Sequence, residues 1–317
     1  MNKSYFEILR PGLNTTIQDK GRYNLYHIGV SVSGAIDQRN YKLANSLVGN
    51  NLDEAVIEFA YQGPHLKLKN ANINFAITGD ILFKIIKKNS KIEVGECYRN
   101  YLLEEGDQLD IISTKKSAYG YLSVSGGLEL QKLWKSYSTN TKAKIGPNNG
   151  NKYSSDDKIF ITNSDVKNFL EKRIDYKALI DNTIRVIKGT NFDYFSKQAI
   201  ENFFNKEFQV TNLADRMGIR LKGHEIENIK NTNIKSEGLV KGVIQVPADG
   251  NPIIMLSDHG TIGGYPKIAN VISADLDAVG QLTPGSNINF KEVSLEEAEN
   301  IFKAYSEETI KYLNESN

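Results

Sequence analysis

The sequence predicts a mainly β fold, with two barrel-like units, a few short helices and a helix at the C-terminus. Short apolar or alternating segments follow one another from residue 55 to residue 128, with turn residues between them, which is typical of β-barrels and sandwiches. Strands that alternate with long helical patterns, as in βαβ units, are nearly absent. The 317 residues are enough for two ordinary domains with sizeable cores. We therefore expect an N-terminal half at 1–180, a C-terminal half at 181–293 and a terminal helix at 294–317.

Charge and composition limit the classes of partner. Lys and Arg number 39 and Asp and Glu 38, so the net charge is +1, and no global field favours nucleic acid or an anionic membrane. The single cysteine, Cys97, excludes an intrachain disulfide. The opening residues lack the apolar core of a signal peptide, and no later run is long enough to span a bilayer. We expect a cytoplasmic protein with no nucleic-acid and no membrane partner.

In the N-terminal half, the first strand is expected at Phe6–Leu9 and is ended by Pro11 and Gly12. Arg39–Val48 has the apolar spacing of a helix, which Gly49 stops. Further strands are expected at Val56–Phe59, Leu66–Leu68, Ile73–Ile77, Ile81–Ile86, Leu109–Ile112 and Tyr119–Val124. The polar stretch 140–157 is expected to be a long loop.

The C-terminal half opens with a strand at Ile184–Ile187. Phe192–Phe204 predicts a helix whose aromatic stripe belongs to the core. Ser294 and Glu297 form a capping box, in which each side chain satisfies a free amide of the other residue. This box predicts the start of the terminal helix, whose apolar face is for packing.

The stretch Ile234–Ile272 combines glycine, proline, carboxylate, amide, tyrosine and lysine between two apolar runs. Val243–Val246 and Pro252–Leu256 are expected to be strands, and the residues between them have turn chemistry. The glycines that follow let the backbone approach a ligand or another chain closely. Gln245, a polar residue in an apolar strand, needs a partner or a ligand. On spacing alone, a tight hairpin with a glycine-rich connection explains the stretch equally well.

The sequence lacks the motifs of several common catalytic and binding sites. It contains no Walker P-loop and no G-x-S-x-G elbow. The four histidines are far apart and lack metal-ligand spacing, so we predict no zinc site and assign no metal ligand among them. No lysine has the context of a biotinyl-lysine.

The motifs S-E-G, G-V-I-Q-V-P-A-D-G-N-P-I-I and T-I-G-G-Y-P-K-I-A-N-V-I resemble one family, as do Q-D-K-G-R and D-R-M-G-I-R-L-K-G. The family contains the allophanate hydrolase subunit 2 proteins, mostly called the C subunit of 5-oxoprolinase, and the biotin-dependent carboxyltransferase region of urea carboxylase. The resemblance covers roughly Phe6 to Val293 and implies cyclophilin-like β-barrels. Tyr137 stands where the family usually has arginine, which weakens any anion-binding role of the W-K-S-Y-S-T segment.

The resemblance implies one component of an ATP-dependent 5-oxoprolinase, which opens 5-oxoproline to L-glutamate. Such a chain acts with a homologue of the B subunit in a stable heteromer and with a separate A subunit, so it is incomplete on its own. ATP with Mg²⁺ is implied as cofactor. One alternative is a regulatory protein that binds a histidine-kinase inhibitor, itself a homologue of the B subunit. Another is the carboxyltransferase component of a urea carboxylase or allophanate pathway, which the lack of carboxylase and biotin-carrier segments disfavours.

Candidate site residues are positions that match the family. Lys267 is expected to supply positive charge, and Asp258 and Glu237 to hold metal or direct water. Arg216 is a second candidate cation. The other candidates for substrate or nucleotide binding are Ser236, Gln245, Gly263, Gly264, Tyr265, Arg22 and Asp37. The structural alternatives are a solvated surface lysine at position 267 and an ion pair between Arg22 and Asp37.

Overall fold

The computed structural model describes residues 3–162, 166, 169–177, 182–230 and 232–315. The chain forms two compact units. The first unit contains Met1–Arg22, Ser33–Ala178 and Thr309–Asn317, and the second contains Tyr23–Val32 and Leu179–Glu308. The segment Tyr23–Val32 thus belongs to the second unit, and the end of the C-terminal helix belongs to the first. The predicted boundaries, with halves at 1–180 and 181–293, assign neither segment in this way.

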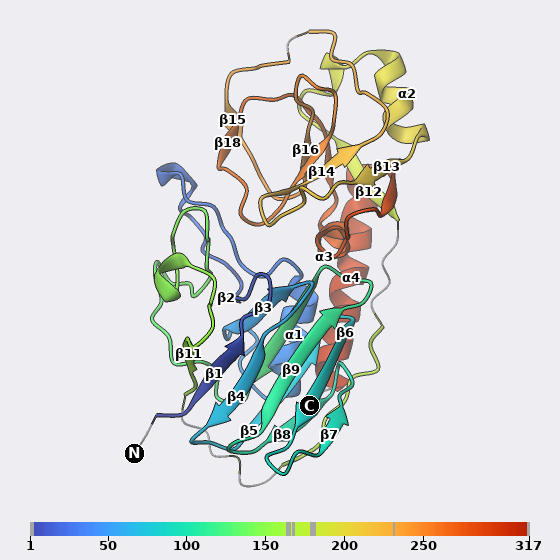
Figure 1. The fold of residues 1–317 in the computed structure, drawn as a ribbon. Helices are drawn as coiled ribbons and strands as arrows, with labels where there is room; N and C mark the ends of the chain where they lie inside the picture. Colours follow the sequence, from blue (N-terminus) through green and yellow to red (C-terminus); the bar gives the residue numbers. More distant parts are fainter. Residues whose placement is uncertain (1–2, 163–165, 167–168, 178–181, 231, 316–317) are drawn as a thin grey trace. The chain divides into compact units, whose positions relative to one another are not determined.

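The first unit is built from two antiparallel sheets (Figure 1). One has the strand order β11-β1-β4-β9-β6-β7 and the other the order β2-β3-β10-β5-β8. The strands are β1 (Tyr5–Arg10), β2 (Thr16–Gln18), β3 (Val56–Ala60), β4 (His65–Lys69), β5 (Ile73–Thr78), β6 (Ile81–Ile86), β7 (Ile92–Val94), β8 (Asn100–Leu103), β9 (Gln108–Thr114), β10 (Tyr119–Val124) and β11 (Lys158–Phe160).

The two sheets share one apolar core. Phe6 and Phe83 from the first sheet and Phe59 and Phe75 from the second belong to a single cluster of fully buried side chains. Alternation places these residues on the inner faces, as β4 and β6 show by their strict succession of buried and half-buried residues. Gly120 allows close packing here, because a Cβ atom at this position would lie 2.6 Å from the Phe59 ring.

The helix α1 (Gln38–Leu47) packs on the five-stranded sheet through β5, β10 and β3. Asp37 is its N-cap: one carboxylate oxygen accepts from the Asn40 amide N–H at 2.9 Å and the other from Asn40 Nδ2 at 2.6 Å. The 3₁₀ turn η2 (Asn148–Gly150) interrupts the predicted loop over 140–157.

We expect Asp37→Ala to lower the free energy of unfolding by about 1–2 kcal/mol, because the first turn of α1 loses its cap. Urea denaturation followed by circular dichroism measures this change. Asp37→Ser keeps a capping oxygen and is the matched control, which should lose less stability than the alanine variant. Equal stability of the alanine variant and the parent would contradict the capping role.

The second unit is a closed barrel with the strand order β12-β19-β16-β17-β14-β13-β20 (Figure 1). The pair β12 and β20 is parallel and the other pairs are antiparallel. The strands are β12 (Thr183–Lys188), β13 (Phe208–Val210), β14 (Gly218–Lys222), β16 (Val243–Gln245), β17 (Ile253–Met255), β19 (Lys267–Val271) and β20 (Asn287–Glu292), with β15 (Glu237–Gly238) and β18 (Ile262–Gly263) in a separate two-stranded sheet.

The predicted helix over Phe192–Phe204 is divided in two. A 3₁₀ turn, η3 (Phe192–Tyr194), comes first, and α2 (Lys197–Asn205) follows after Ser196, whose hydroxyl caps it. The aromatic stripe is core, as predicted: the rings of Phe203 and Phe290 stack with their centroids 4.4 Å apart. The remaining short helices of this unit are η1 (Tyr26–Ile28), η4 (Ser273–Asp275) and α3 (Leu276–Gly280).

The C-terminal helix α4 (Leu295–Glu315) begins in the second unit and ends in the first. The predicted capping box is present, because the Ser294 amide donates to Glu297 Oε2 at 2.7 Å and the Glu297 amide donates to Ser294 Oγ at 3.1 Å. Tyr312 explains why the last residues belong to the first unit, since its ring packs edge-on against Tyr176 with centroids 5.0 Å apart.

The predicted class is confirmed: the fold is mainly β, it contains a closed barrel, and a helix ends it. Barrel closure is seen in the second unit, whereas the strands of the first unit form the two sheets described above. Within the described part of the chain, no helix combines the length and the apolar character that crossing a bilayer requires.

Candidate functional site

Lys267, at the start of β19, lies directly opposite Gln245 of β16, next to an irregularity in the pairing. Its backbone is held on both sides by Asn191, whose Oδ1 accepts from the Lys267 amide at 3.1 Å and whose amide donates to the Lys267 carbonyl at 3.2 Å. The residue is only 4 % exposed. The alternative of a solvated surface lysine is therefore wrong, because almost the whole residue is shielded from water.

The Lys267 ammonium donates to Glu237 Oε2 at 2.5 Å. The two side chains differ in burial: that of Lys267 is 5 % exposed and that of Glu237 is 46 % exposed. Glu237 lies on β15, where it pairs with Gly263 of β18. Two of the predicted catalytic residues are thus in contact. The Glu237 carboxylate is paired with a lysine, whereas its predicted role is to hold metal or direct water.

Gln245 is 3 % exposed, and its Nε2 donates to the Tyr265 carbonyl at 3.0 Å. The strand β18 passes close to this amide: a Cβ atom on Gly263 would lie 2.8 Å from Gln245 Nε2. A Cβ atom on Gly264 would lie 3.1 Å from the Ile234 carbonyl and 3.6 Å from the hydroxyl of Ser236. The structure therefore brings together Ser236, Glu237, Gln245, Gly263, Gly264, Tyr265 and Lys267, which we call the Lys267 cluster.

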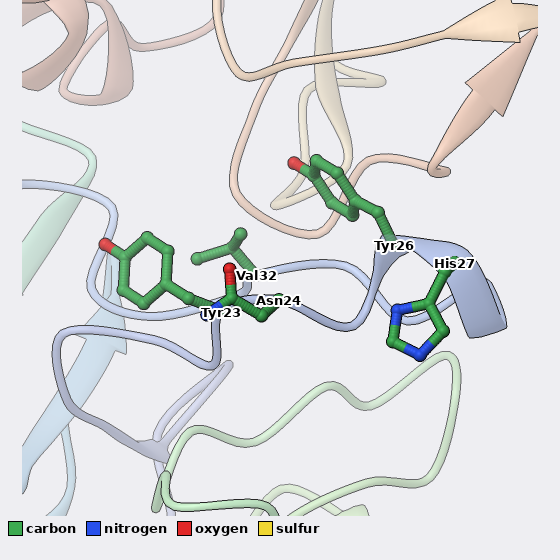
Figure 2. A pocket seen from close by; sticks show the side chains of 5 residues that line it. All are labelled: Tyr23, Asn24, Tyr26, His27 and Val32. Atoms are coloured by element: carbon green, nitrogen blue, oxygen red, sulfur yellow. The ribbon is translucent and has the colours of Figure 1, made fainter.

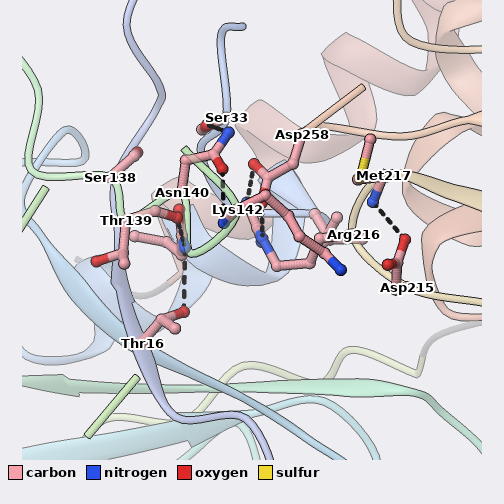
Figure 3. Close-up of polar contacts among 12 residues, drawn as sticks. Thr16, Ser33, Ser138, Thr139, Asn140, Lys142, Asp215, Arg216, Met217 and Asp258 are labelled. Atoms are coloured by element: carbon pink, nitrogen blue, oxygen red, sulfur yellow. Dashed lines mark hydrogen bonds and ion pairs between the residues drawn. The ribbon is translucent and has the colours of Figure 1, made fainter. Parts of the chain in front are cut away.

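Arg216 and Asp258 form a second pair within the same unit. Arg216 Nε donates to Asp258 Oδ2 at 2.9 Å and its Nη2 donates to Oδ1 at 3.1 Å. The side chains are 6 % and 2 % exposed. Asp215, the preceding residue, turns the chain by accepting from the Met217 amide at 2.8 Å (Figure 3). A bidentate pair of this kind cancels both charges and uses both oxygens that Asp258 was predicted to offer to a metal or water.

His259, which the sequence did not mark as a functional residue, lies beside this pair and is 1 % exposed. Its Nδ1 is 2.5 Å from the Gly260 carbonyl, so Nδ1 carries the proton, and Nε2 accepts from the Tyr26 hydroxyl at 3.3 Å. Burial lowers the pKa of His259, against the opposing effects of the Gly260 carbonyl and Asp258. This contact explains why the segment Tyr23–Val32 belongs to the second unit.

We expect acidification to destabilise the protein through His259. A histidine whose pKa is lowered by folding is protonated less readily in the folded state than in the unfolded state. Its contribution to the free energy of unfolding is therefore complete above the unfolded pKa of about 6.5 and is lost as the pH falls below that value. The loss is at most about 1.4 kcal/mol per pH unit. Urea denaturation at pH 7.5 and pH 5.5 should show a smaller pH effect for His259→Gln than for the parent. An equal effect in both proteins would remove His259 as the cause.

Tyr26 also lines a cavity of about 450 Å³ within the segment Tyr23–Val32. The other lining residues are Tyr23, Asn24, His27 and Val32, and Figure 2 shows the side chains of Tyr26 and His27 pointing away from each other. None of these residues is a predicted site residue, because a short aromatic segment has no motif that marks it.

In the first unit, Asp19 organises two segments that are far apart in the sequence. Its carboxylate accepts from Ser136 Oγ at 2.7 Å, from the Tyr137 amide at 2.7 Å and from the Gly21 amide at 2.8 Å, as well as from Ser138 Oγ. Arg22 is 1 % exposed and donates to the Ser138 carbonyl. The Q-D-K-G-R motif and the W-K-S-Y-S-T segment are therefore one structural assembly. Asp19 and the two serines were not predicted as site residues, although all three lie in motifs that match the family.

The candidate residues of the first unit have contacts that hold its fold. Arg22 belongs to the Asp19 assembly, and Asp37 caps α1. Nearby, the Asn140 amide donates to the Ser33 hydroxyl at 3.3 Å (Figure 3). Substrate or nucleotide binding by Arg22 and Asp37 stays a prediction.

Comparison with known proteins supports the resemblance seen in the sequence. The chain is 33 % identical over 293 residues to the 5-oxoprolinase C subunit of Haemophilus influenzae and 30 % identical over 294 residues to the Escherichia coli protein of the same name. In both comparisons the match covers 92 % of each chain.

Among solved structures, the urea amidolyase of K. lactis matches 98 % of this chain with a TM-score of 0.89 and 26 % identity. This chain covers 20 % of that much longer protein. Residues 28–292 match the model of the family described as "Carboxyltransferase domain, subdomain A and B". The predicted family is confirmed, and the chain belongs to the family of carboxyltransferase domains with subdomains A and B.

Proposed function

We propose that the chain is the C subunit of a 5-oxoprolinase, the enzyme that opens the lactam of 5-oxoproline to L-glutamate. The observation that carries this proposal is the 33 % identity to a protein named as the C subunit of this enzyme, over 92 % of both chains. The urea amidolyases, by contrast, match over 17 % of their own length. A full-length counterpart is a closer functional guide than one region of a large multidomain protein.

In this function, the Lys267 cluster is the part of the chain that binds substrate. A buried ammonium suits a carboxylate, and a buried amide such as that of Gln245 suits a hydrogen-bonding group. Both belong to strands of the barrel and are held in place by it. These residues would orient the substrate, while the ring-opening step needs the other subunits.

The residues predicted to bind ATP with Mg²⁺ do not fit that cofactor. Both side chains of the Arg216–Asp258 pair are buried and joined by two hydrogen bonds, so Arg216 offers no uncompensated charge to a phosphate, and Lys267 offers one ammonium, which lies against Glu237. Among the described residues, no group of three or more His, Cys, Asp or Glu side chains could hold a metal ion. We therefore derive no phosphoryl step on this chain and propose that ATP acts at the A and B subunits.

Co-expression with homologues of the A and B subunits tests the proposal. We expect a stable complex on gel filtration at micromolar concentration, with an interface larger than the standard size. The complex should release glutamate from 5-oxoproline in the presence of ATP, and omission of this chain should abolish the release. Undiminished glutamate release without the chain, or separate elution of the subunits, would contradict it.

A second candidate is carboxyl transfer, which the family match and the TM-score of 0.89 to urea amidolyase favour. It requires a carboxylated biotin carrier as co-substrate. Consumption of carboxybiotin in the presence of urea, without glutamate release from 5-oxoproline, would favour this candidate. The regulatory alternative predicts binding to the homologue of the B subunit, without either activity.

A further inference from the structure

The ion pair in the Lys267 cluster joins a buried, fixed cation to an exposed anion. Lys267 is held by Asn191 and by two neighbouring strands, and its ammonium contacts Glu237. An ammonium has three donors, and within the described ranges no other side chain is paired with this one. Glu237 therefore supplies the one carboxylate that this ammonium contacts among the described side chains, and we call its place the anion position.

The support of Glu237 is slight in comparison. Its strand β15 has two residues and pairs with the two residues of β18. Among the described residues, this pairing is continued only by the amides of Ile234 and Leu239, which donate to the Gly264 and Thr261 carbonyls at 2.8 and 2.9 Å. A two-stranded sheet of this size has little stability of its own. Glu237 and Gly238 are both exposed, and a Cβ atom on Gly238 would meet nothing within 4 Å. The Glu237 side chain reaches solvent from this strand, whereas that of Lys267 is buried.

Gln245 adds a second recognition element beside the anion position. It is the register partner of Lys267, on the neighbouring strand and next to a shift in the register. Its Nε2 donates to the Tyr265 carbonyl, which leaves Oε1 as the acceptor of the amide. A ligand that suits both residues has a carboxylate for the ammonium and a neighbouring N–H group for Oε1.

We propose that the Glu237 carboxylate is an internal competitor, which a small-molecule carboxylate with a neighbouring N–H group displaces in order to pair with Lys267 and Gln245. The choice of 5-oxoproline as a probe rests on the proposed function, because this molecule has its carboxylate next to a lactam N–H. Displacement itself rests on the difference in burial and support between the two partners. Binding then separates Glu237 from Lys267 and loosens the β15–β18 pairing.

Calorimetric titration of the reconstituted complex tests the competition. In Glu237→Gln the competing charge is gone, so we expect the Kd of 5-oxoproline to fall roughly tenfold if Glu237 occupies the site about nine-tenths of the time. Cyclopentanecarboxylate, which keeps the ring size and the carboxylate, should also bind more tightly. The neutral 5-oxoprolinamide should not gain affinity. Lys267→Ala should lose the binding of both carboxylates.

Glu292→Gln is the matched control, because Glu292 forms an ion pair with Lys188 at 3.1 Å in the same unit and neither residue belongs to the Lys267 cluster. Its Kd values should equal those of the parent. A second measurement needs no variant: saturating carboxylate should speed the hydrogen exchange of the amides in β15 and β18 of the parent protein.

An unchanged or weaker carboxylate affinity in Glu237→Gln, or unchanged exchange in β15 and β18, would overturn the inference. So would improved binding of inorganic phosphate without improved binding of cyclopentanecarboxylate. Tighter cyclopentanecarboxylate binding with no binding of 5-oxoproline would support displacement and contradict the proposed function. Normal 5-oxoproline turnover with an unchanged KM in Glu237→Gln would support the proposed function and contradict displacement.

Discussion

Lys267→Ala should lower kcat/KM for 5-oxoproline in the reconstituted complex by roughly a hundredfold or more, which equals about 2.7 kcal/mol of transition-state stabilisation. The reason is that the only ammonium in the Lys267 cluster is lost, and with it the charge that orients the substrate. Steady-state assays of glutamate release measure the change.

Two companion variants separate charge from packing. Lys267→Met fills most of the buried space without the charge and should be as inactive as the alanine variant. Lys188→Ala removes a half-exposed lysine of the same unit and should keep normal activity. Glu237 is half exposed, so it stays solvated after loss of its partner, and the variants should still fold and assemble. Normal activity of Lys267→Met would remove this residue from the site.

Asp258→Ala should lower the free energy of unfolding by about 3–5 kcal/mol, because it leaves the Arg216 guanidinium buried without its carboxylate. Both side chains are almost completely buried and make two hydrogen bonds to each other. Denaturation in urea, with the midpoint and the slope analysed separately, measures the loss.

The double variant Arg216→Met with Asp258→Ala is the control for this prediction. Replacing both partners by uncharged groups removes the unpaired charge, so the double variant should be more stable than Asp258→Ala alone. A loss of less than about 1 kcal/mol in Asp258→Ala would show that the pair is solvated. Activity retained in the double variant would assign both residues a structural role.

Features that depend on neighbouring residues could be predicted from the sequence. The short strands with turns between them predicted the mainly β class, and the apolar spacing after Asp37 predicted α1 to within one residue at each end. The Ser294 and Glu297 box predicted the start of α4. The hairpin of β16 and β17 followed from two apolar runs around a turn. Each of these depends on interactions within a few residues, and periodicity and capping record such interactions directly.

The family motifs, for their part, marked positions but not roles. They placed Gly263 and Gln245 among the candidates, and the structure shows why a glycine is needed there, since β18 passes within contact of the Gln245 amide. The sequence could not show that Arg22 and Asp37 have partners within the first unit, because the identity of a charged residue does not reveal whether it binds a ligand or another part of the fold.

The pairing of charges, by contrast, depends on contacts between residues that are far apart in the sequence. Glu237 and Lys267 are 30 residues apart, Arg216 and Asp258 are 42 apart, and Asp19 and Ser136 are 117 apart. Tyr26 and His259 are 233 residues apart, and their contact assigns Tyr23–Val32 to the second unit. Such pairs form when the barrel closes and the sheets pack, so no local pattern encodes them. Folding also buries Lys267 beside Glu237, and a buried charge is costly unless it is paired.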